Sequence, residues 1–508
     1  MNSAAESLGA CHAAESERAR RTILRTIFSF PALLGVLLFA GVFFGTLSQG
    51  TKSDTLFSEG DTWWHLRAGE DILRTHRVPH TDSYSWTAAG TGWIAYEWLG
   101  EVAMAEAYRL GGLRGLKLFQ LLLNGGMLTL LYAYAALRSG NAKAAFVVCA
   151  LITPVAAVFW SLRPQLCGYI LFLVVLVLIE RFRRGNNRVI WFLPVIFLIW
   201  VNLHGTFVFG FMALGIAWTC GLRSVRWNAI ESSAWSPPQR SNLAIAALLS
   251  SMALFLTPYS SQLAAYPFDI GFLQPANIAN VQEWLPVTAE RFLAVVVTGL
   301  LLTFFIWTLT ARTTHRLDDV LFVGIASLLA TTHLRFVPLL LIVCVPLIAA
   351  LFARILPRLN PHRDRPGLNA GLMVASLAAI AFFFPTTATL EKTFAEHMPV
   401  AAAAYLREHP SKGEMFNEYG WGGYLAWVRV PSSGVFIDGR ADIYERAGVL
   451  QDYLSISRLE PGAILILKKY SIHICMLRRD APLATVLAAM PDWRAVYADS
   501  LSVIYTRE

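Results

Sequence analysis

Long apolar runs with almost no charged residue recur along the whole chain. Blocks such as Phe30–Gln49, Gln165–Ile179 and Phe336–Phe352 approach the length of about 20 residues that a helix needs to cross a hydrocarbon layer roughly 30 Å thick. A bilayer offers no water to satisfy backbone polar groups, so helix is the form expected for these runs. The pattern therefore predicts a polytopic α-helical membrane protein.

The apolar pattern predicts about eleven transmembrane helices. Their approximate bounds are 28–49, 115–137, 143–161, 165–182, 189–203, 206–222, 242–258, 292–311, 319–333, 336–353 and 369–386. Composition agrees, because 15% of the 508 residues are charged, whereas soluble domains are nearer 25%. The first run follows a basic stretch at Arg18–Arg25 and lacks a small-residue cleavage site, so we expect a retained signal anchor.

The distribution of positive charge predicts the orientation. With the segment 1–27 inside, the short inner loops contain fifteen Lys and Arg residues, and the short outer connections contain only Arg163, Arg291 and Arg335. Positively charged loops remain on the cytoplasmic side. We therefore expect a bacterial inner-membrane protein with a cytoplasmic N-terminus and a periplasmic C-terminus. The same asymmetry accounts for much of the net charge of +8, so no nucleic-acid partner is expected.

A first outer loop, residues 50–112, falls outside the predicted bilayer core. Its pattern predicts a helix at Asp61–Thr75, a hairpin-like stretch at Tyr84–Ile94 that turns at 89–92, and a second helix at Glu97–Leu110. Five tryptophans lie in this loop. Such density is typical of a layer at the headgroup level of a membrane.

The C-terminal tail, residues 387–508, is also too polar to lie in the bilayer. Strand-like runs at Val435–Asp438, Ile472–Leu477 and Leu501–Tyr505 alternate with helical segments such as Ala481–Met490. A tail of about 120 residues is long enough for a small periplasmic α/β domain. The expected organisation is a cytoplasmic segment, a transmembrane domain that includes the first outer loop, and this C-terminal domain, at 1–27, 28–386 and 387–508.

The first outer loop begins with a cluster of ionisable residues, Glu59, Asp61 and His65. Asp61 can act as a general base on an acceptor hydroxyl, with His65 beside it as a substrate-binding residue. Glu59 can share a divalent metal ion or the acceptor with Asp61, which makes these two carboxylates the candidate metal ligands. The structural alternative is that Asp61 is the N-cap of the helix that follows it.

Further polar residues lie at the outer ends of other helices by this topology. As candidate substrate-binding residues we select Arg163, His204, Glu283, His333 and Arg335. An arginine at a membrane surface can bind a phosphate through a two-pronged contact. The structural alternative is that Arg163 and Arg335 extend to the interface as anchors. Their shared location on the side that usually lacks positive charge favours a binding role for the set.

Two motifs in the tail contain conspicuous glycine or charged residues. Gly420–Gly423 suggests tight turns and close backbone approach. Asp438, Arg440 and Asp442 follow a strand-like run, and we interpret them as a structural ion pair in preference to a binding cluster. No Asp or Glu falls in the middle of a predicted span, which argues against an ion-coupled transporter.

This layout resembles the GT-C superfamily of membrane glycosyltransferases, which includes protein O-mannosyltransferases and the aminoarabinose transferases of lipid A. The segments Gly60–Gly69, Tyr96–Leu99 and Phe436–Arg440 are more specifically similar to a group of largely uncharacterised bacterial GT-C-like proteins. The resemblance implies that Asp61 is the catalytic acid of the first loop and that the transfer inverts the sugar. Many members have adjacent acids or Asp-x-Asp, whereas this chain has Glu59-Gly60-Asp61, so metal dependence stays open.

The resemblance therefore implies a membrane glycosyltransferase that moves a hexose or pentose from a polyprenyl-phosphate donor to a glycan, lipid or protein acceptor. The expected partners are this lipid-linked sugar and membrane lipid, and the expected cofactor is at most a divalent metal ion. One alternative is a non-catalytic envelope protein that binds a lipid-linked glycan. The other is a transporter or flippase.

Overall fold

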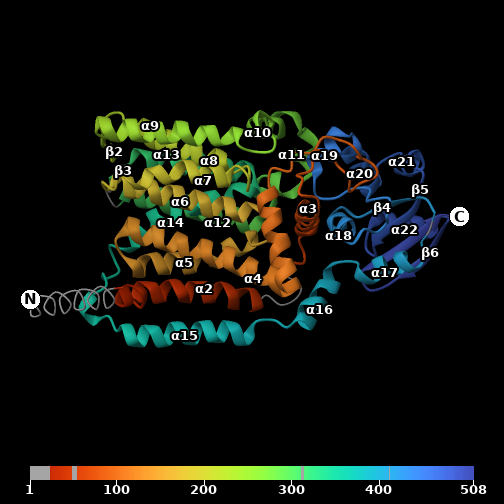
Figure 1. Cartoon of the computed structure of the whole chain (residues 1–508), viewed down its shortest axis with the longest axis horizontal. Coiled ribbons are helices and arrows are strands. Elements are labelled where there is room, and N and C mark those ends of the chain that lie inside the picture. The colour runs from red at the N-terminus through yellow and green to blue at the C-terminus, as the bar shows by residue number, and fades with distance from the viewer. Residues whose placement is uncertain (1–22, 49–53, 311–313, 411, 508) are drawn as a thin grey trace, which may run out of the picture. The chain divides into compact units, whose positions relative to one another are not determined.

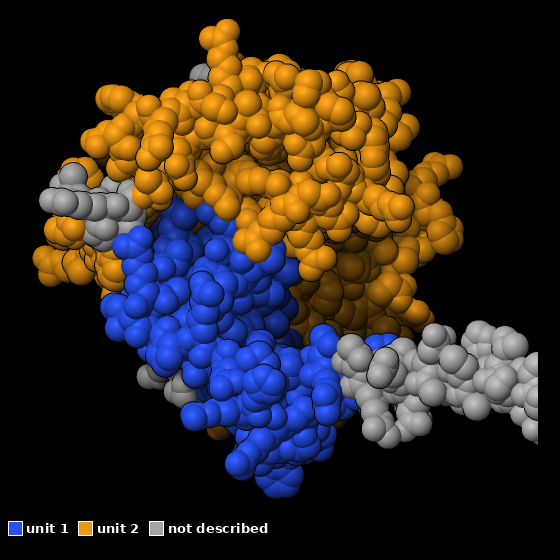
Figure 2. Space-filling view, turned by 90° about the vertical axis from the view of Figure 1, so that its left-hand side faces the viewer, with its two compact units in different colours: residues 1–48, 124–154, 344–384 blue, residues 49–123, 155–343, 385–508 orange. Residues whose placement is uncertain are grey.

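The computed structural model describes residues 23–48, 54–310, 314–410 and 412–507. Most of the segment 1–27, including Arg18, lies outside the described residues. Contacts divide the chain into two units, which are coloured separately in Figure 2. Unit 1 comprises residues 1–48, 124–154 and 344–384, and unit 2 comprises residues 49–123, 155–343 and 385–508.

Unit 1 consists of long apolar helices. It contains α2 (Phe30–Ser48), α15 (Pro366–Phe383), and parts of α4 (Trp98–Ser139), α5 (Ala142–Ala156) and α14 (Val337–Phe352). Helices α2 and α15 pack against each other, and the ring of Phe43 stacks on that of Phe384 at 6.1 Å between centroids. At the other end of this pair, the Asn369 amide donates a 2.8 Å hydrogen bond to the Phe28 carbonyl. These contacts join two helices that are far apart in sequence.

Unit 2 combines the first loop, a helical region and the tail. The first loop contains α3 (Asp61–Thr75), and the helical region contains helices and a small sheet. These elements are α6 (Gln165–Arg183), α7 (Leu193–Trp200), α8 (Phe207–Cys220), β1 (Val225–Trp227), β2 (Ile230–Ser232), α9 (Pro237–Met252), α10 (Ser261–Leu273), α11 (Pro275–Asn280), α12 (Arg291–Thr310), β3 (His315–Arg316) and α13 (Leu317–Thr332). In Figure 1, α3 lies beside α18 (Tyr419–Val428) of the tail, and the two helices are in contact.

The tail forms a mixed four-stranded sheet with helices. Its elements are α16 (Thr387–His397), α17 (Val400–Glu408), β4 (Glu414–Asn417), α18 (Tyr419–Val428), α19 (Ala441–Arg446), α20 (Val449–Ser457), α21 (Ala463–Lys469), β5 (Ile472–Arg478), α22 (Pro482–Ala489), β6 (Trp493–Ala498) and β7 (Ser502–Arg507). The strand order is β4-β5-β7-β6, with β4 parallel to β5 and the other pairs antiparallel. A small C-terminal α/β region is therefore present, as the sequence predicted.

Every one of the eleven apolar runs contains a helix in the described part of the chain. Six of the helices are long and apolar enough to cross a membrane by length and composition. The chain is thus a multi-pass, mostly helical membrane protein. The number eleven and the periplasmic location of the loop and tail stay predictions.

The described residues contradict the hairpin predicted at Tyr84–Ile94. No strand pair forms there, because Asp82 organises a turn in its place. Its carboxylate accepts hydrogen bonds from the backbone amides of Tyr84 and Ser85, each at 3.1 Å. An isolated bridge between Thr81 and Gly92 closes the loop.

The strand predicted at Val435–Asp438 is also wrong. This segment lies against the first loop, and it forms no part of the tail's own sheet. The Val435 amide donates to the Tyr84 carbonyl at 3.0 Å, and the Trp86 amide donates to the Val435 carbonyl at 3.1 Å. A hydrophobic run of this length identifies a buried extended segment, but its pairing partner depends on the tertiary structure.

The glycines Gly420–Gly423 lie within helix α18, so the prediction of tight turns there is wrong. The prediction of close backbone approach is confirmed for two of them. A methyl group added to Gly423 would lie 2.3 Å from the Gly60 carbonyl oxygen, and one added to Gly422 would lie 1.9 Å from the Ile437 carbonyl oxygen. Small residues at these positions allow α18 to contact both the first loop and the segment that follows Val435.

Candidate active site

Helix α3 presents Asp61 at its first turn. Gly60 occupies the N-cap position and offers no side-chain capping bond, so the interpretation of Asp61 as the N-cap is wrong. The Asp61 carboxylate is held from two other directions. Oδ1 accepts a 3.1 Å hydrogen bond from Trp64 Nε1, and Oδ2 forms a 2.8 Å ion pair with Arg163. Asp61 is 9% exposed, which leaves it accessible from one side.

Arg163 is shared between two carboxylates. It precedes α6 in the segment between α5 and α6, and its guanidinium contacts both Asp61 and Glu283. Arg335 lies nearby, with its guanidinium 4.2 Å from the centre of the Trp284 ring. Two cations and two acids from four separate segments therefore meet in one region of unit 2.

The shared cation gives the two acids different protonation behaviour. The pKa of Asp61 is raised to about 7, mainly by burial, with the charges of Glu59 and Glu283 acting in the same direction and that of Arg163 opposing them. Burial also raises the pKa of Glu283, but Arg163 and Arg335 outweigh it and lower that pKa to about 2. Glu283 is therefore the permanent counter-ion of Arg163. Asp61 therefore exists as a mixture of protonated and deprotonated forms at neutral pH.

A cavity of about 450 Å³ opens in front of Asp61. The first loop contributes Trp64, Trp93 and Tyr96 to its walls, and the tail contributes Tyr419, Gly439, Asp442 and Tyr453. Polar and aromatic groups dominate these walls. A lining of this kind suits a sugar, because hydroxyl groups need hydrogen-bond partners and the apolar faces of the ring pack on aromatic side chains.

A second cavity, of about 210 Å³, adjoins the first. The two cavities share Glu59, Arg163, Gln282, Glu283 and Arg335 in their walls. The rest of the second cavity is mainly apolar and includes Val158, Phe159, Leu166, Leu293, Leu334 and Pro338, several of which lie on apolar helices. The arginine pair thus lies between a polar compartment and an apolar one.

A buried cluster of acids and histidines borders the larger cavity. His65 contacts Glu101 at 3.1 Å through Nδ1 and Glu97 at 3.4 Å through Nε2, and His204 contacts Glu97 at 3.0 Å. Burial lowers the pKa of His65 to about 3, so that histidine is neutral. Burial raises the pKa of Glu97, but the charge of His204 and its hydrogen bond to Glu97 oppose this, and the pKa is lowered to about 2. Glu97 and Glu101 both line the cavity.

The same cluster has the composition of a metal site. Ligand atoms of His65, Glu97 and Glu101 lie within 4.8 Å of one another. Glu101 Oε2 is buried and has no hydrogen-bond partner among the described residues. A buried oxygen without a hydrogen-bond partner destabilises the fold unless a ligand binds to it. A neutral imidazole and two carboxylates together suit a divalent ion such as Mn²⁺ or Zn²⁺.

The structure brings most, but not all, of the sequence-predicted residues together. Asp61, Glu59, Arg163, Glu283 and Arg335 line the cavities. His65 and His204 lie one layer behind, where they contact Glu97. His333 lines neither cavity, and its Nδ1 lies 2.6 Å from the Trp284 carbonyl oxygen.

Four residues at the site were not among the sequence-predicted ones: Glu97, Glu101, Tyr419 and Gly439. A signal was available for Glu97, because it belongs to the Tyr96–Leu99 motif that carries part of the family resemblance. Glu101 follows it by one helical turn on the same face. Tyr419 and Gly439 carry no such local signal, since the tail approaches Asp61 only through tertiary packing.

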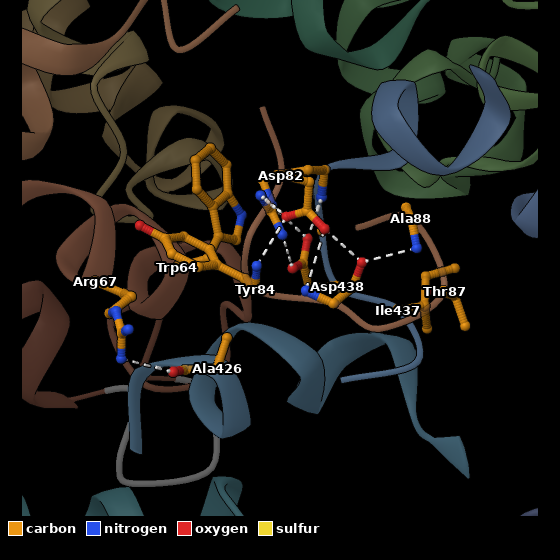
Figure 3. A network of polar contacts seen from close by, with 12 residues as sticks. Trp64, Arg67, Asp82, Tyr84, Thr87, Ala88, Ala426, Ile437 and Asp438 are labelled. Carbon is orange, nitrogen blue, oxygen red and sulfur yellow. Dashed lines mark hydrogen bonds and ion pairs between the residues drawn. The ribbon is translucent and has the colours of Figure 1, made fainter. Parts of the chain in front are cut away.

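A buried charge network ties the tail to the first loop. Arg440 is 2% exposed, donates a hydrogen bond from Nε to Asp438 at 2.9 Å, and forms an ion pair with Asp82 through Nη1 at 2.7 Å. Its guanidinium also lies over the rings of Tyr84 and Trp93, at 4.8 and 4.7 Å from their centres. Figure 3 shows Asp82 and Asp438 facing each other within this network.

The structural ion pair predicted in the tail is therefore confirmed for Asp438 and Arg440. Asp442 does not belong to it. Its carboxylate accepts a 3.0 Å hydrogen bond from the Tyr266 hydroxyl and forms an ion pair with Arg446 at 3.5 Å. Asp442 thus connects the tail to the segment that contains α10.

Comparisons with known proteins give likenesses of structure only. No family profile matches the chain, and no curated protein matches it. The oligosaccharyltransferase of Archaeoglobus fulgidus in its apo form is similar over 87% of this chain and 69% of its own, with 10% identity and a TM-score of 0.49. ArnT from Cupriavidus metallidurans, bound to undecaprenyl phosphate, is similar over 93% of this chain and 97% of its own, with 14% identity and a TM-score of 0.47.

A further structure of the archaeal enzyme, AglB with an inhibitory peptide and a dolichol-phosphate, is similar over 85% of this chain and 67% of its own. The identity is 11% and the TM-score 0.48. At this level of likeness, function has to be argued from the residues of this chain.

Replacement of Arg440 by methionine is expected to destabilise unit 2 strongly. The change leaves two carboxylates buried without their cation, which typically costs about 3–5 kcal/mol. Thermal unfolding of the detergent-solubilised protein measures the loss. As a matched control, Arg478→Met removes an arginine that is half exposed and paired with exposed Asp480, where a change of about 0–1 kcal/mol is expected. Equal effects of the two substitutions would contradict this role of Arg440.

Proposed function

We propose that this protein is a GT-C-type glycosyltransferase that moves a sugar from a polyprenyl-phosphate donor to an acceptor at the outer face of the membrane. One observation carries the proposal. A carboxylate of near-neutral pKa, Asp61, faces a polar, aromatic cavity at the point where two arginines separate it from an apolar cavity. The arrangement provides a base, an anion site and separate compartments for sugar and lipid.

The chemistry assigns one role to each group. The acceptor hydroxyl loses its proton to the Asp61 carboxylate as its oxygen attacks the anomeric carbon of the donor sugar. The bond between that carbon and the phosphate oxygen breaks, and polyprenyl phosphate leaves with the electron pair. Attack opposite to the leaving group inverts the anomeric carbon. No oxidant or further reactant is needed.

The arginine pair supports the leaving group. Arg163 and Arg335 line both cavities, so a phosphate between the compartments would meet both guanidinium groups. The apolar walls of the second cavity, at Val158, Leu166 and Leu293, suit the first isoprene units of the lipid. A phosphate at Arg163 also competes with Asp61 for that cation. Donor binding would therefore free the carboxylate for its role as a base.

The cluster of His65, Glu97 and Glu101 is the proposed site of a divalent metal ion. The sequence had suggested Glu59 and Asp61, but both oxygens of Asp61 are already engaged by Trp64 and Arg163. A bound cation would supply positive charge at the cavity wall, where it favours a phosphate. His204 supports the cluster by orienting Glu97.

Two further features favour transfer over the alternatives. The described cavities around Asp61 lie among loops, helix ends and the tail, whereas a transporter needs a binding site near the midplane. A protein that only holds a lipid-linked glycan needs no carboxylate of near-neutral pKa beside its anion site. We propose the bacterial inner membrane as the location, with the first loop and the domain 387–508 in the periplasm.

Asp61→Asn is expected to reduce sugar transfer by about 10²–10⁴-fold, because the amide cannot accept the acceptor proton. Radiolabelled sugar transfer from a panel of polyprenyl-phosphate donors, in membranes with matched protein levels, measures the effect. Asp71→Asn is the matched control on the same helix, since Asp71 pairs with Arg67 and Arg74 and lines neither cavity. Equal activity of wild type and Asp61→Asn would remove Asp61 from the mechanism. A wild type inactive with every donor would favour the glycan-binding alternative.

The transfer rate is expected to rise with pH and to level off above a midpoint near 7. Burial raises the pKa of Asp61 to about 7 in the free protein, and only the deprotonated carboxylate can act as a base, so kcat/KM falls as the solution becomes more acidic. A pH profile of kcat/KM, which reports the groups of the free enzyme, measures the midpoint. A profile that stays flat over about pH 5–8, the range over which such a carboxyl titrates, would contradict the assignment.

Added Mn²⁺ is expected to raise the thermal unfolding midpoint of chelator-treated wild type and to leave that of Glu101→Gln unchanged. Binding to the folded state alone stabilises by about 2.7 kcal/mol when the ligand concentration is 100 times Kd. Glu106→Gln is the matched control on helix α4, because Glu106 pairs with Arg109 outside the cluster. An equal response of the two variants would exclude the cluster as the metal site.

A further inference from the structure

The tail reaches the Asp61 carboxylate itself, through a glycine. A methyl group added to Gly439 would lie 1.6 Å from Asp61 Oδ1 and 2.8 Å from its carboxyl carbon. It would also lie 3.1 Å from Nε1 of Trp64, the group that bonds Oδ1. Side-chain carbon atoms do not approach other atoms this closely, so only glycine fits beside Asp61 in this position.

A second contact fixes the backbone of residues 60–64, which carries Asp61. A methyl group added to Gly423, on helix α18, would lie 2.3 Å from the Gly60 carbonyl oxygen and 3.2 Å from the backbone nitrogen of Trp64. Helix α18 therefore packs directly on the first turn of α3. On the side of the carboxylate, the Gly439 backbone is held in place by Arg440, whose partners Asp82 and Asp438 are both buried.

These contacts surround one side chain from two directions. Gly423 limits the position of the first turn of α3, and Gly439 limits where the carboxylate can go. Within those limits, Asp61 directs one oxygen to Trp64 and the other to Arg163. The contacts also explain two glycine-containing tail motifs that the catalytic chemistry alone leaves without a role.

We propose that Gly423 and Gly439 are positioning residues for Asp61, so that the C-terminal domain is a working part of the active site. This inference rests on the proposed function for its effect on rate, but the contact it describes can be tested without any activity. With alanine at 439, Asp61 has to leave its place between Trp64 and Arg163. A displacement of about 1 Å is enough to reduce a rate by roughly 10²-fold.

The first arm of the experiment measures stability. Gly439→Ala is expected to lower the thermal unfolding midpoint of the purified protein by several degrees. Asp61→Ala removes the carboxylate that the new methyl group would strike, so the double variant is expected to recover most of that loss. Such non-additivity is the signature of two residues in contact. Additive losses would overturn the contact. If the Gly439→Ala protein does not accumulate in cells, accumulation of the double variant with Asp61→Ala would support the contact, and its failure to accumulate would overturn it.

The second arm measures the transfer reaction. Gly439→Ala and Gly423→Ala are expected to lower kcat by about 10²-fold while the KM for the donor changes much less, because the arginine pair and the second cavity are untouched. A purely structural defect would reduce the amount of active enzyme but would leave the midpoint of the pH profile unchanged. Displacement of Asp61 from Arg163 is expected to shift that midpoint. Wild-type kcat in both variants would overturn the positioning role.

Gly420→Ala is the matched control. Gly420 lies in the same helix and motif, but a methyl group there meets no atom within 4 Å, so kcat and stability are expected to stay near those of wild type. A loss equal to that of Gly423→Ala would show that the motif is generally intolerant and would overturn the specific contact. Absence of transfer in wild type would refute the proposed function, and the stability arm would still decide whether the tail positions Asp61.

Discussion

The site is organised around one buried guanidinium, that of Arg163, which two carboxylates share. A single cation cannot fully neutralise both, so the acids separate in behaviour, with the pKa of Glu283 depressed and that of Asp61 raised by its burial. The same cation lies at the wall between the polar and apolar cavities. In the proposed mechanism, charge balance at Arg163 determines which acid acts as the base and where an anionic donor would bind.

That charge balance depends on accurate placement of residues from distant parts of the chain. Asp61 comes from the first loop, Arg163 from the start of α6, Glu283 from the segment after α11, and Gly439 from the tail. The buried network of Arg440 with Asp82 and Asp438 holds the tail against the first loop. Burying three charges is costly unless each is paired, so this network has a narrow set of acceptable geometries.

The apolar and the polar parts of the sequence were informative in different ways. Helices such as α6 (Gln165–Arg183) were predicted almost to the residue, because an uncharged run in a membrane has only one way to satisfy its backbone. Helix α3 was predicted at its true bounds for a similar reason, since its polar and apolar positions alternate with helical spacing. The predictions for the segments 84–94 and 435–438 were wrong, because the two segments pair with each other at Ser85 and Val435 and the Asp82 carboxylate forms a turn at the start of the first.

For the candidate site, the sequence by itself determined the chemical types: a carboxylate in the first loop and arginines at helix ends, at positions where local composition departs from its surroundings. The tertiary structure decided the pairings. Asp61 contacts Trp64 and Arg163, and Glu97 and Glu101 lie around His65. A glycine of the tail, Gly439, lies against Asp61 although the two residues are 378 positions apart in the sequence. Local sequence does not predict these contacts, because they depend on how whole helices and loops pack against one another.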